Sequence, residues 1–151
     1  MRARLVPLAL PLLAALLAAG LPAFAANESR VALVIGNAAY REAPLKNPAN
    51  DAADIAAALK RLGFEVILRQ NAGLAEMERA VGDFGKKLRQ GGIGLFYFAG
   101  HGLQVKGENY LVPVDANIES EADVRFKCLN AGFVLGKMED AGNQEIGRAH
   151  V

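Results

Sequence analysis

The chain has 151 residues, of which 52% are hydrophobic, and 17 basic residues nearly balance 16 acidic ones. This length suggests one domain, and the hydrophobic fraction is large enough to bury a core, which argues against a disordered protein. The near-neutral charge and the lack of a basic cluster in the sequence argue against a nucleic-acid-binding protein.

The first 25 residues differ from the rest of the chain. Arg2 and Arg4 precede a long apolar run that ends in Ala23-Phe24-Ala25, and this order is typical of a secretory signal peptide. Proline and glycine residues interrupt the run, so we expect cleavage after Ala25 and no membrane association of the mature chain. A retained membrane anchor is the alternative. The mature protein would be slightly acidic and exported, in a bacterium to the periplasm.

Two elements follow the predicted signal peptide. Residues 30–37 form a continuous apolar run that ends in Gly-Asn, which predicts a strand buried on both faces. Residues 47–63 predict a helix, because Asn47 can cap it, Pro48 suits its first turn and Gly63 suits its end. Its apolar residues recur at spacings of three and four, as on one face of a helix.

The later elements are predicted in the order strand, helix, strand, hairpin and helix: 64–70, 74–90, 93–99, 103–112 with its turn at 106–108, and 131–142. The second helix contains Gly82 and Gly85, each of which costs about 1 kcal/mol of helix propensity, so packing must hold it. Alternating strands and helices predict an α/β fold with a mostly parallel sheet. In such sheets, ligands and catalytic groups gather at the carboxyl ends of the strands.

His101 lies just past the third strand, between Gly100 and Gly102. Flanking glycines let the backbone turn sharply and let another group approach closely. The imidazole can carry a proton and the Gly102 N–H can donate to an oxyanion, which are two of the three parts of an acyl-transfer site. A surface histidine without a role is the alternative. Asn37 and Tyr40 follow the first strand and could line the same cleft, or serve only the turn.

Cys128 is the one cysteine, so an intrachain disulfide is excluded. Arg125 and Lys127 could lower the pKa of its thiol. However, its surroundings predict a loop, or a position just before a helix, and not the end of an apolar strand, so Cys128 is a weak candidate for the nucleophile. The sequence has no zinc-ligand spacing, no P-loop and no GxGxxG, so we predict no metal or nucleotide cofactor.

Four segments together resemble the caspase-like cysteine peptidases of family C14, in particular bacterial members related to metacaspases. They are "RVALVIGNAAY" (30–40), "LKNPANDAADIAAAL" (45–59), "FYFAGHGLQVKGENYLVPVDA" (96–116) and "KMEDAGN" (137–143). The resemblance implies a caspase-like three-layer sandwich with a mostly parallel central sheet, formed by residues 26–145. It also implies hydrolysis of peptide or protein substrates by a Cys-His dyad, without a cofactor.

The resemblance assigns roles to single residues. His101 matches the histidine of the dyad, and Gly102 matches the glycine whose N–H helps to bind the oxyanion. Asp51 in "ANDAAD" matches an aspartate that helps metacaspases bind a basic P1 side chain, and Leu45 stands where aspartate-cutting caspases have arginine. Cleavage after Arg or Lys is therefore expected, with Asn37 as a further substrate-binding candidate. By position alone, Asp51 could instead be a first-turn residue favoured by the helix dipole.

The family's nucleophile lies in Asp-Ala-Cys, about 50 residues after the histidine, and this tripeptide is not in the sequence. We therefore expect residues 26–145 to be a partial caspase-like domain that is incomplete at its C-terminus and inactive by itself. The tail "IGRAHV" (146–151) resembles a translated sequencing adapter, so we expect it to be non-native and His150 to have no role. A natural short C-terminus is the alternative. A non-catalytic caspase-like binding or regulatory module is the second functional hypothesis.

Overall fold

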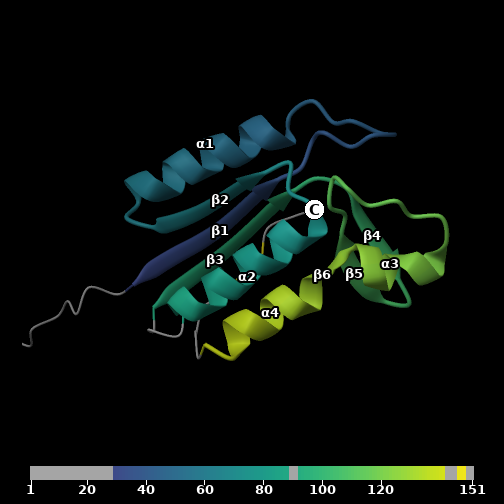
Figure 1. Ribbon diagram of the computed structural model, residues 1–151. Helices are drawn as coiled ribbons and strands as arrows, with labels where there is room; N and C mark the ends of the chain where they lie inside the picture. Colours follow the sequence, from purple (N-terminus) through teal and green to yellow (C-terminus); the bar gives the residue numbers. More distant parts are fainter. Residues whose placement is uncertain (1–28, 89–91, 142–145, 149–151) are drawn as a thin grey trace, which may run out of the picture.

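The computed structural model describes residues 29–88, 92–141 and 146–148 of the chain (Figure 1). The predicted signal peptide, residues 1–25, lies outside these residues. The elements follow in the order β1 (Arg30–Gly36), α1 (Pro48–Arg61), β2 (Glu65–Gln70), α2 (Leu74–Leu88), β3 (Ile93–Ala99), β4 (Gly102–Val105), β5 (Glu108–Leu111), α3 (Glu121–Lys127), β6 (Leu129–Asn130), α4 (Ala131–Glu139) and β7 (Ile146–Arg148).

The larger sheet has the strand order β2-β1-β3-β7, and all of its pairs are parallel. β1 is central, and it pairs with β2 from Val31 onward and with β3 from Arg30 onward. Because the strands are parallel, the carboxyl ends of β1, β2 and β3 meet at one edge of the sheet. This confirms the predicted mostly parallel sheet and places the segment after β3 beside the segment after β1.

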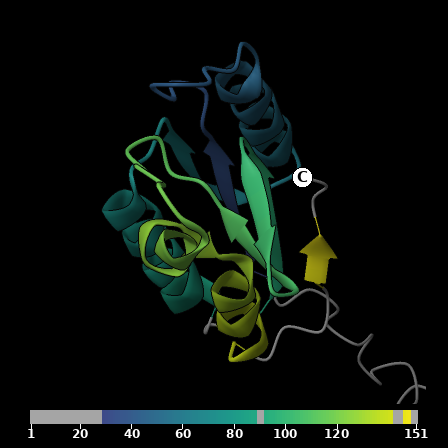
Figure 2. The ribbon, with the colours of Figure 1, turned by 90° about the vertical axis from the view of Figure 1, so that its right-hand side faces the viewer.

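Helices cover both faces of this sheet, with α1 on one face and α2 and α4 on the other (Figures 1 and 2). Alternate β1 residues take part in the two layers: Leu33 and Ile35 pack with α2 and α4, whereas Ala32 and Val34 pack with α1. A strand buried on both faces needs apolar residues at every position, which explains the continuous apolar run. The predicted three-layer sandwich is therefore confirmed.

A smaller antiparallel sheet, β4-β5-β6, lies next to the carboxyl end of β3, where His101 joins β3 to β4 (Figure 1). Lys106 (φ 52°) and Gly107 (φ 83°) join β4 to β5. Two positive φ angles in a two-residue loop are typical of a type I′ turn, so the predicted hairpin is confirmed. α3 and β6 are not among the elements predicted from the sequence. α3 is a short helix whose start is fixed by a capping box between Ser120 and Asp123.

The remaining boundaries are close to those predicted. Asn47 is at the N-cap of α1, although its side chain makes no capping hydrogen bond, and Gly63 (φ 82°) follows the end of that helix. Residues 146–148 pair with Gly94–Phe96 of β3. They belong to the tail that we predict to be non-native, and the pairing does not test that prediction.

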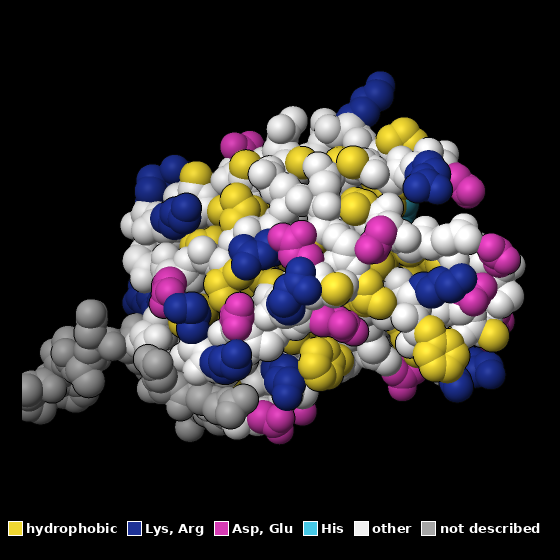
Figure 3. All heavy atoms as spheres, in the orientation of Figure 1, with side chains coloured by type: hydrophobic (Ala, Val, Ile, Leu, Met, Phe, Trp, Pro, Cys, Tyr) yellow, Lys and Arg dark blue, Asp and Glu magenta, His cyan; other side chains and the backbone are white. Residues whose placement is uncertain are grey.

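The surface of the described residues shows two further features. On the face seen in Figure 3, acidic and basic side chains are interspersed rather than gathered by sign. Among the helices of the described residues, none is both long and apolar enough to cross a membrane.

Candidate active site

His101 lies directly after β3, where two contacts fix its imidazole. The Nε2 atom is 2.8 Å from the carbonyl oxygen of Ala43, in the loop after β1, and the ring centroid is 4.5 Å from that of Tyr40. A carbonyl oxygen can only accept, so Nε2 carries the hydrogen in this bond. In the neutral ring, Nδ1 is then the nitrogen that can take up a proton. This is the arrangement needed by a general base that later acts as a general acid.

Tyr40 also holds the backbone at His101. Its hydroxyl oxygen accepts from the His101 N–H and donates to the carbonyl oxygen of Val112, each over 3.0 Å. Burial raises the pKa of the Tyr40 phenol, so the hydroxyl keeps its proton and remains a donor. A Cβ at Gly100 would lie 2.5 Å from this hydroxyl oxygen, so glycine is required there for close approach.

The hairpin register determines the direction of the Gly102 N–H. Val112 N–H donates to the carbonyl oxygen of His101 over 2.9 Å, so these two residues lie at a hydrogen-bonded position of the ladder, although the His101 N–H donates to Tyr40 instead of to Val112. Hydrogen-bonded and non-hydrogen-bonded pairs alternate along an antiparallel ladder, so the next pair, Gly102 with Leu111, is non-hydrogen-bonded. The Gly102 N–H therefore points away from β5, on the outer side of the edge strand β4. A backbone donor that does not pair with β5 thus follows His101 directly in the chain, and its predicted oxyanion role stays a prediction.

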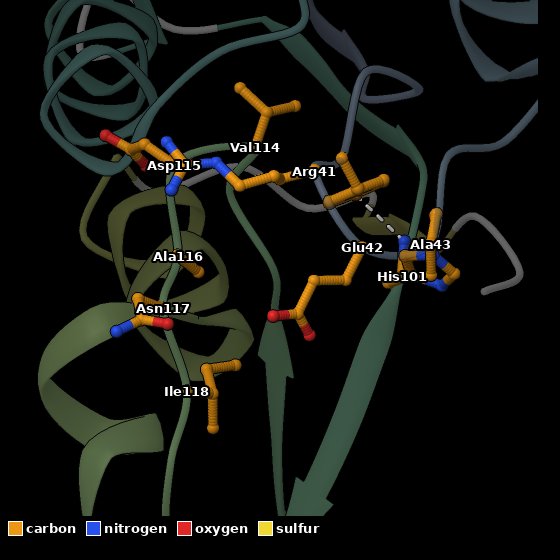
Figure 4. A pocket seen from close by; sticks show the side chains of 10 residues that line it. Arg41, Glu42, Ala43, His101, Val114, Asp115, Ala116, Asn117 and Ile118 are labelled. Carbon is orange, nitrogen blue, oxygen red and sulfur yellow. Dashed lines mark hydrogen bonds between the residues drawn. The ribbon is translucent and has the colours of Figure 1, made fainter.

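A cavity of about 230 Å³ opens beside His101 (Figure 4). Its walls are the loop after β1, residues 40–43, and the loop after β5, residues 114–118. The side chains of Arg41, Glu42 and Asp115 bring charge to it. The cavity is open to solvent and is large enough to hold a side chain next to the imidazole.

Asn37 is completely buried, at 0% exposure. Its Oδ1 accepts from the N–H of Ala72 over 2.9 Å, and its Nδ2 donates to the carbonyl oxygens of Ala72 and Val112 over 3.2 and 3.3 Å. These bonds tie the end of β1 to the loops before α2 and after β5. The prediction that Asn37 binds substrate does not fit this burial; its amide instead positions the loops that surround the site.

Asp51 is exposed in the first turn of α1. It lies near Tyr97 of β3, whose pKa is raised by burial and, to a smaller extent, by the negative charge of Asp51. Tyr97 packs in the α1 layer, so Asp51 is on the α1 side of the sheet edge. Asp51 does not line the cavity beside His101. Its predicted role in binding a basic P1 side chain stays a prediction.

Cys128 is buried, at 5% exposure, in an apolar cluster of the small sheet that includes Tyr40, Tyr110 and Val124. Burial raises the pKa of its thiol to about 11. The suggestion that Arg125 and Lys127 lower this pKa is therefore wrong, because desolvation dominates. A thiol that is protonated at neutral pH and does not line the cavity is unsuited to be the nucleophile.

Comparison with known proteins shows the family of the chain. The family model of the caspase domain, peptidase C14, matches residues 29–142. The chain belongs to the caspase domain family. Over 114 residues it is 42% identical to the human mucosa-associated lymphoid tissue lymphoma translocation protein 1 and 41% identical to the mouse homologue. Each match covers 75% of this chain, but only 14% of the human protein and 13% of the mouse protein.

Two contributors to the site of this caspase domain were missed or underestimated from the sequence. The carbonyl of Ala43 belongs to the main chain, so no residue type could have indicated it. Tyr40 was noted, but its bonds to His101 and Val112 depend on the hairpin returning beside the loop after β1. The family membership supports a cysteine peptidase class for the domain.

Proposed function

We propose that this caspase domain carries the histidine and one oxyanion donor of a cysteine endopeptidase that cleaves protein substrates after Arg or Lys. The observation that supports this most strongly is the setting of His101. Its Nε2 is engaged by Ala43, its Nδ1 can accept a proton, and the outward N–H of Gly102 is adjacent. The predicted export of the mature chain remains part of the proposal.

The chemistry follows from these groups. Nδ1 of His101 takes the proton of a cysteine thiol, and the thiolate attacks the scissile carbonyl carbon. The carbonyl oxygen becomes an oxyanion, which the Gly102 N–H stabilises. The imidazolium then gives its proton to the leaving amine nitrogen as the C–N bond breaks. Water hydrolyses the resulting thioester, with His101 acting again as the base.

We place the nucleophilic cysteine outside the 151 residues, at the end of a strand beside β3. β7 occupies this position beside β3, although its residues fall in the tail that we expect to be non-native. The buried Cys128, with its raised pKa, does not suit the role. The 151-residue chain alone is then inactive.

The preference for a basic P1 residue rests on Asp51. Its carboxylate is exposed at the N-terminal turn of α1, close to the edge where β1 and β3 end. A carboxylate there can form a charge-assisted hydrogen bond with a Lys or Arg side chain. The match of Asp51 to the metacaspase aspartate supports the same assignment.

The test uses the product of the full-length gene and peptides that have Arg, Lys, Gln or Asp at P1. We expect cleavage after Arg and Lys, and a fall in kcat/KM of about 10²–10⁴-fold for His101→Ala, the usual range for a general acid–base group. Asp51→Asn should reduce the preference for Arg over Gln, whereas Asp54→Asn, one turn further along α1, should not. Cleavage that is absent, or that is unaffected by His101→Ala, would refute the proposal.

A non-catalytic caspase-like binding module is the second candidate. The burial of the chain's one cysteine favours it. The gene sequence that follows residue 145 separates the two candidates. A strand that ends without a cysteine would favour the binding module, which should bind peptides and leave them intact.

A further inference from the structure

One wall of the cavity beside His101, the loop after β5, lies on the α2 side of the sheet edge, whereas the other wall, residues 40–43, belongs to the loop that leads into α1. The loop after β5 is attached to the start of α2, because Val114 N–H donates to the carbonyl oxygen of Ala72 over 3.1 Å and Asp115 Oδ1 accepts from Leu74 N–H over 3.0 Å. α2 covers one face of the sheet, whereas Asp51 lies on the α1 face. His101 therefore stands between two regions that can each contact a substrate.

Glu42 is the residue of this cavity whose carboxylate is available to bind a ligand. Asp115 is already engaged by Leu74, and Figure 4 shows the Arg41 side chain extending toward Asp115. The Glu42 carboxylate points into the open part of the cavity (Figure 4), and no described residue forms a hydrogen bond or ion pair with it. A cationic group entering the cavity would therefore meet an available negative charge next to His101.

We propose that this cavity is the S1′ subsite and that Glu42 binds a Lys or Arg side chain there. The inference rests on the proposed peptidase function. Successive side chains of an extended peptide point to opposite sides, so a P1 side chain at Asp51 directs its neighbours toward the α2 face. His101 protonates the leaving amine nitrogen, which belongs to P1′, so P1′ begins at the cavity wall.

The size of the cavity agrees with a single side chain. Its volume of about 230 Å³ is below the range of about 300–1,000 Å³ that is usual for sites of drug-sized ligands. Glu42 and Arg41 are both exposed, so the discrimination should be modest and should weaken as salt increases. The substrate class that follows has two adjacent basic residues, one on each side of the cleaved bond.

The experiment compares peptides that share Arg at P1 and carry Lys, Gln or Glu at P1′, with the full-length protein. We expect kcat/KM to be about 2- to 5-fold higher for Lys than for Gln, as for an exposed ion pair, and lowest for Glu. Glu42→Gln should abolish the preference for Lys over Gln, and Glu42→Lys should reverse it. Glu78→Gln, an exposed position on α2 away from the cavity, should keep the wild-type ratio.

An unchanged ratio in Glu42→Gln, or equal kcat/KM for the Lys and Gln peptides in the unsubstituted protein, would overturn the subsite while leaving His101-dependent cleavage intact. If cleavage does not depend on His101, the proposed function fails. The S1′ proposal is then tested by measuring peptide binding. A labelled Arg-Lys peptide should then bind the 151-residue chain more tightly than an Arg-Gln peptide, and this difference should vanish in Glu42→Gln. Equal affinities in the unsubstituted chain would overturn the inference.

Discussion

The candidate site depends on main-chain groups as much as on side chains. The carbonyl of Ala43 sets the tautomer of His101, and the ladder alternation directs the N–H of Gly102 outward. Both are main-chain groups, so neither depends on the side chain of Ala43 or of residue 102. His101 could be selected from the sequence because its flanking glycines and its place after an apolar run are visible there. Asn37 and Cys128 are unsuited to the roles considered for them because both side chains are buried. Burial results from the whole fold, so it could not be read from the sequence.

Tyr40 is the residue whose removal should reveal how the backbone at His101 is held. In Tyr40→Phe the ring contact is kept, but the His101 N–H loses its partner, whereas the Val112 carbonyl still accepts from Asn37 Nδ2. A buried polar group left unpaired costs about 1–3 kcal/mol. We expect the free energy of unfolding to fall by about this amount, measured by urea denaturation monitored by circular dichroism. In the full-length protein, kcat should fall more than KM rises.

Tyr110→Phe is the matched control. Tyr110 is as buried as Tyr40, at 9% exposure against 8%, and its hydroxyl has no hydrogen-bond partner among the described residues. The control should therefore cost less stability and leave kcat unchanged. Equal losses in the two variants would show that the Tyr40 hydroxyl does not hold the His101 backbone.

At the scale of elements, the β4–β5 hairpin positions Gly102 and Val112, and its turn imposes a backbone requirement. A Cβ at Gly107 would meet no atom within 4 Å, but its φ of 83° is unfavourable for a residue with a side chain. Gly107→Ala should therefore destabilise the protein by about 1–2 kcal/mol, the cost of left-handed backbone for an L-residue. The shift of the urea denaturation midpoint, with the m-value unchanged, measures this loss of stability.

Gly136→Ala provides the opposite case. Gly136 lies inside α4, also with open space around its Cβ position, and its backbone is helical. Alanine there should stabilise the protein by about 0.5–1 kcal/mol, through helix propensity. If both substitutions change stability in the same direction, the difference in backbone conformation is not what determines their effects.

Elements with strong periodicity could be predicted from the sequence, and short ones could not. The runs that form β1, α1 and β3 are long, and their flanking Gly, Pro and Asn residues mark where they end. α3 has only seven residues, too few for a repeating apolar face, and the pairing of β6 is decided by β5. The Ser120 and Asp123 capping box was the signal that could have indicated α3.

On the scale of the whole molecule, the site forms where two sheets meet. The parallel sheet brings the segments after β1 and β3 together, and the small antiparallel sheet returns the 114–118 loop beside them. The α/β class could be predicted from the sequence, since each strand and each helix has its own pattern of apolar residues. The cavity could not, because its walls come from segments about 70 residues apart whose proximity depends on the order of the strands.

The apolar cluster of the small sheet predicts how the stability of the whole molecule changes with pH. Burial raises the pKa of Cys128 from an ordinary value of 9.0 to about 11, and it also raises the pKa of Tyr40 above 10.0. Between about pH 9 and 11, the unfolded chain has released its thiol proton while the folded chain still binds it. Stability therefore falls with rising pH over this range, because the folded state binds more protons.

The free energy of unfolding, measured by urea denaturation from pH 8 to 11, should thus be flat up to about pH 9 and then decline. Cys128→Ala should make the decline shallower, since alanine cannot ionise, even though the variant starts from a lower stability at pH 8. Val124→Ala, a neighbour in the same cluster, should lower stability at every pH and keep the wild-type slope. A decline that is equally steep in Cys128→Ala would mean that ionisation of this thiol is not coupled to unfolding of the small sheet.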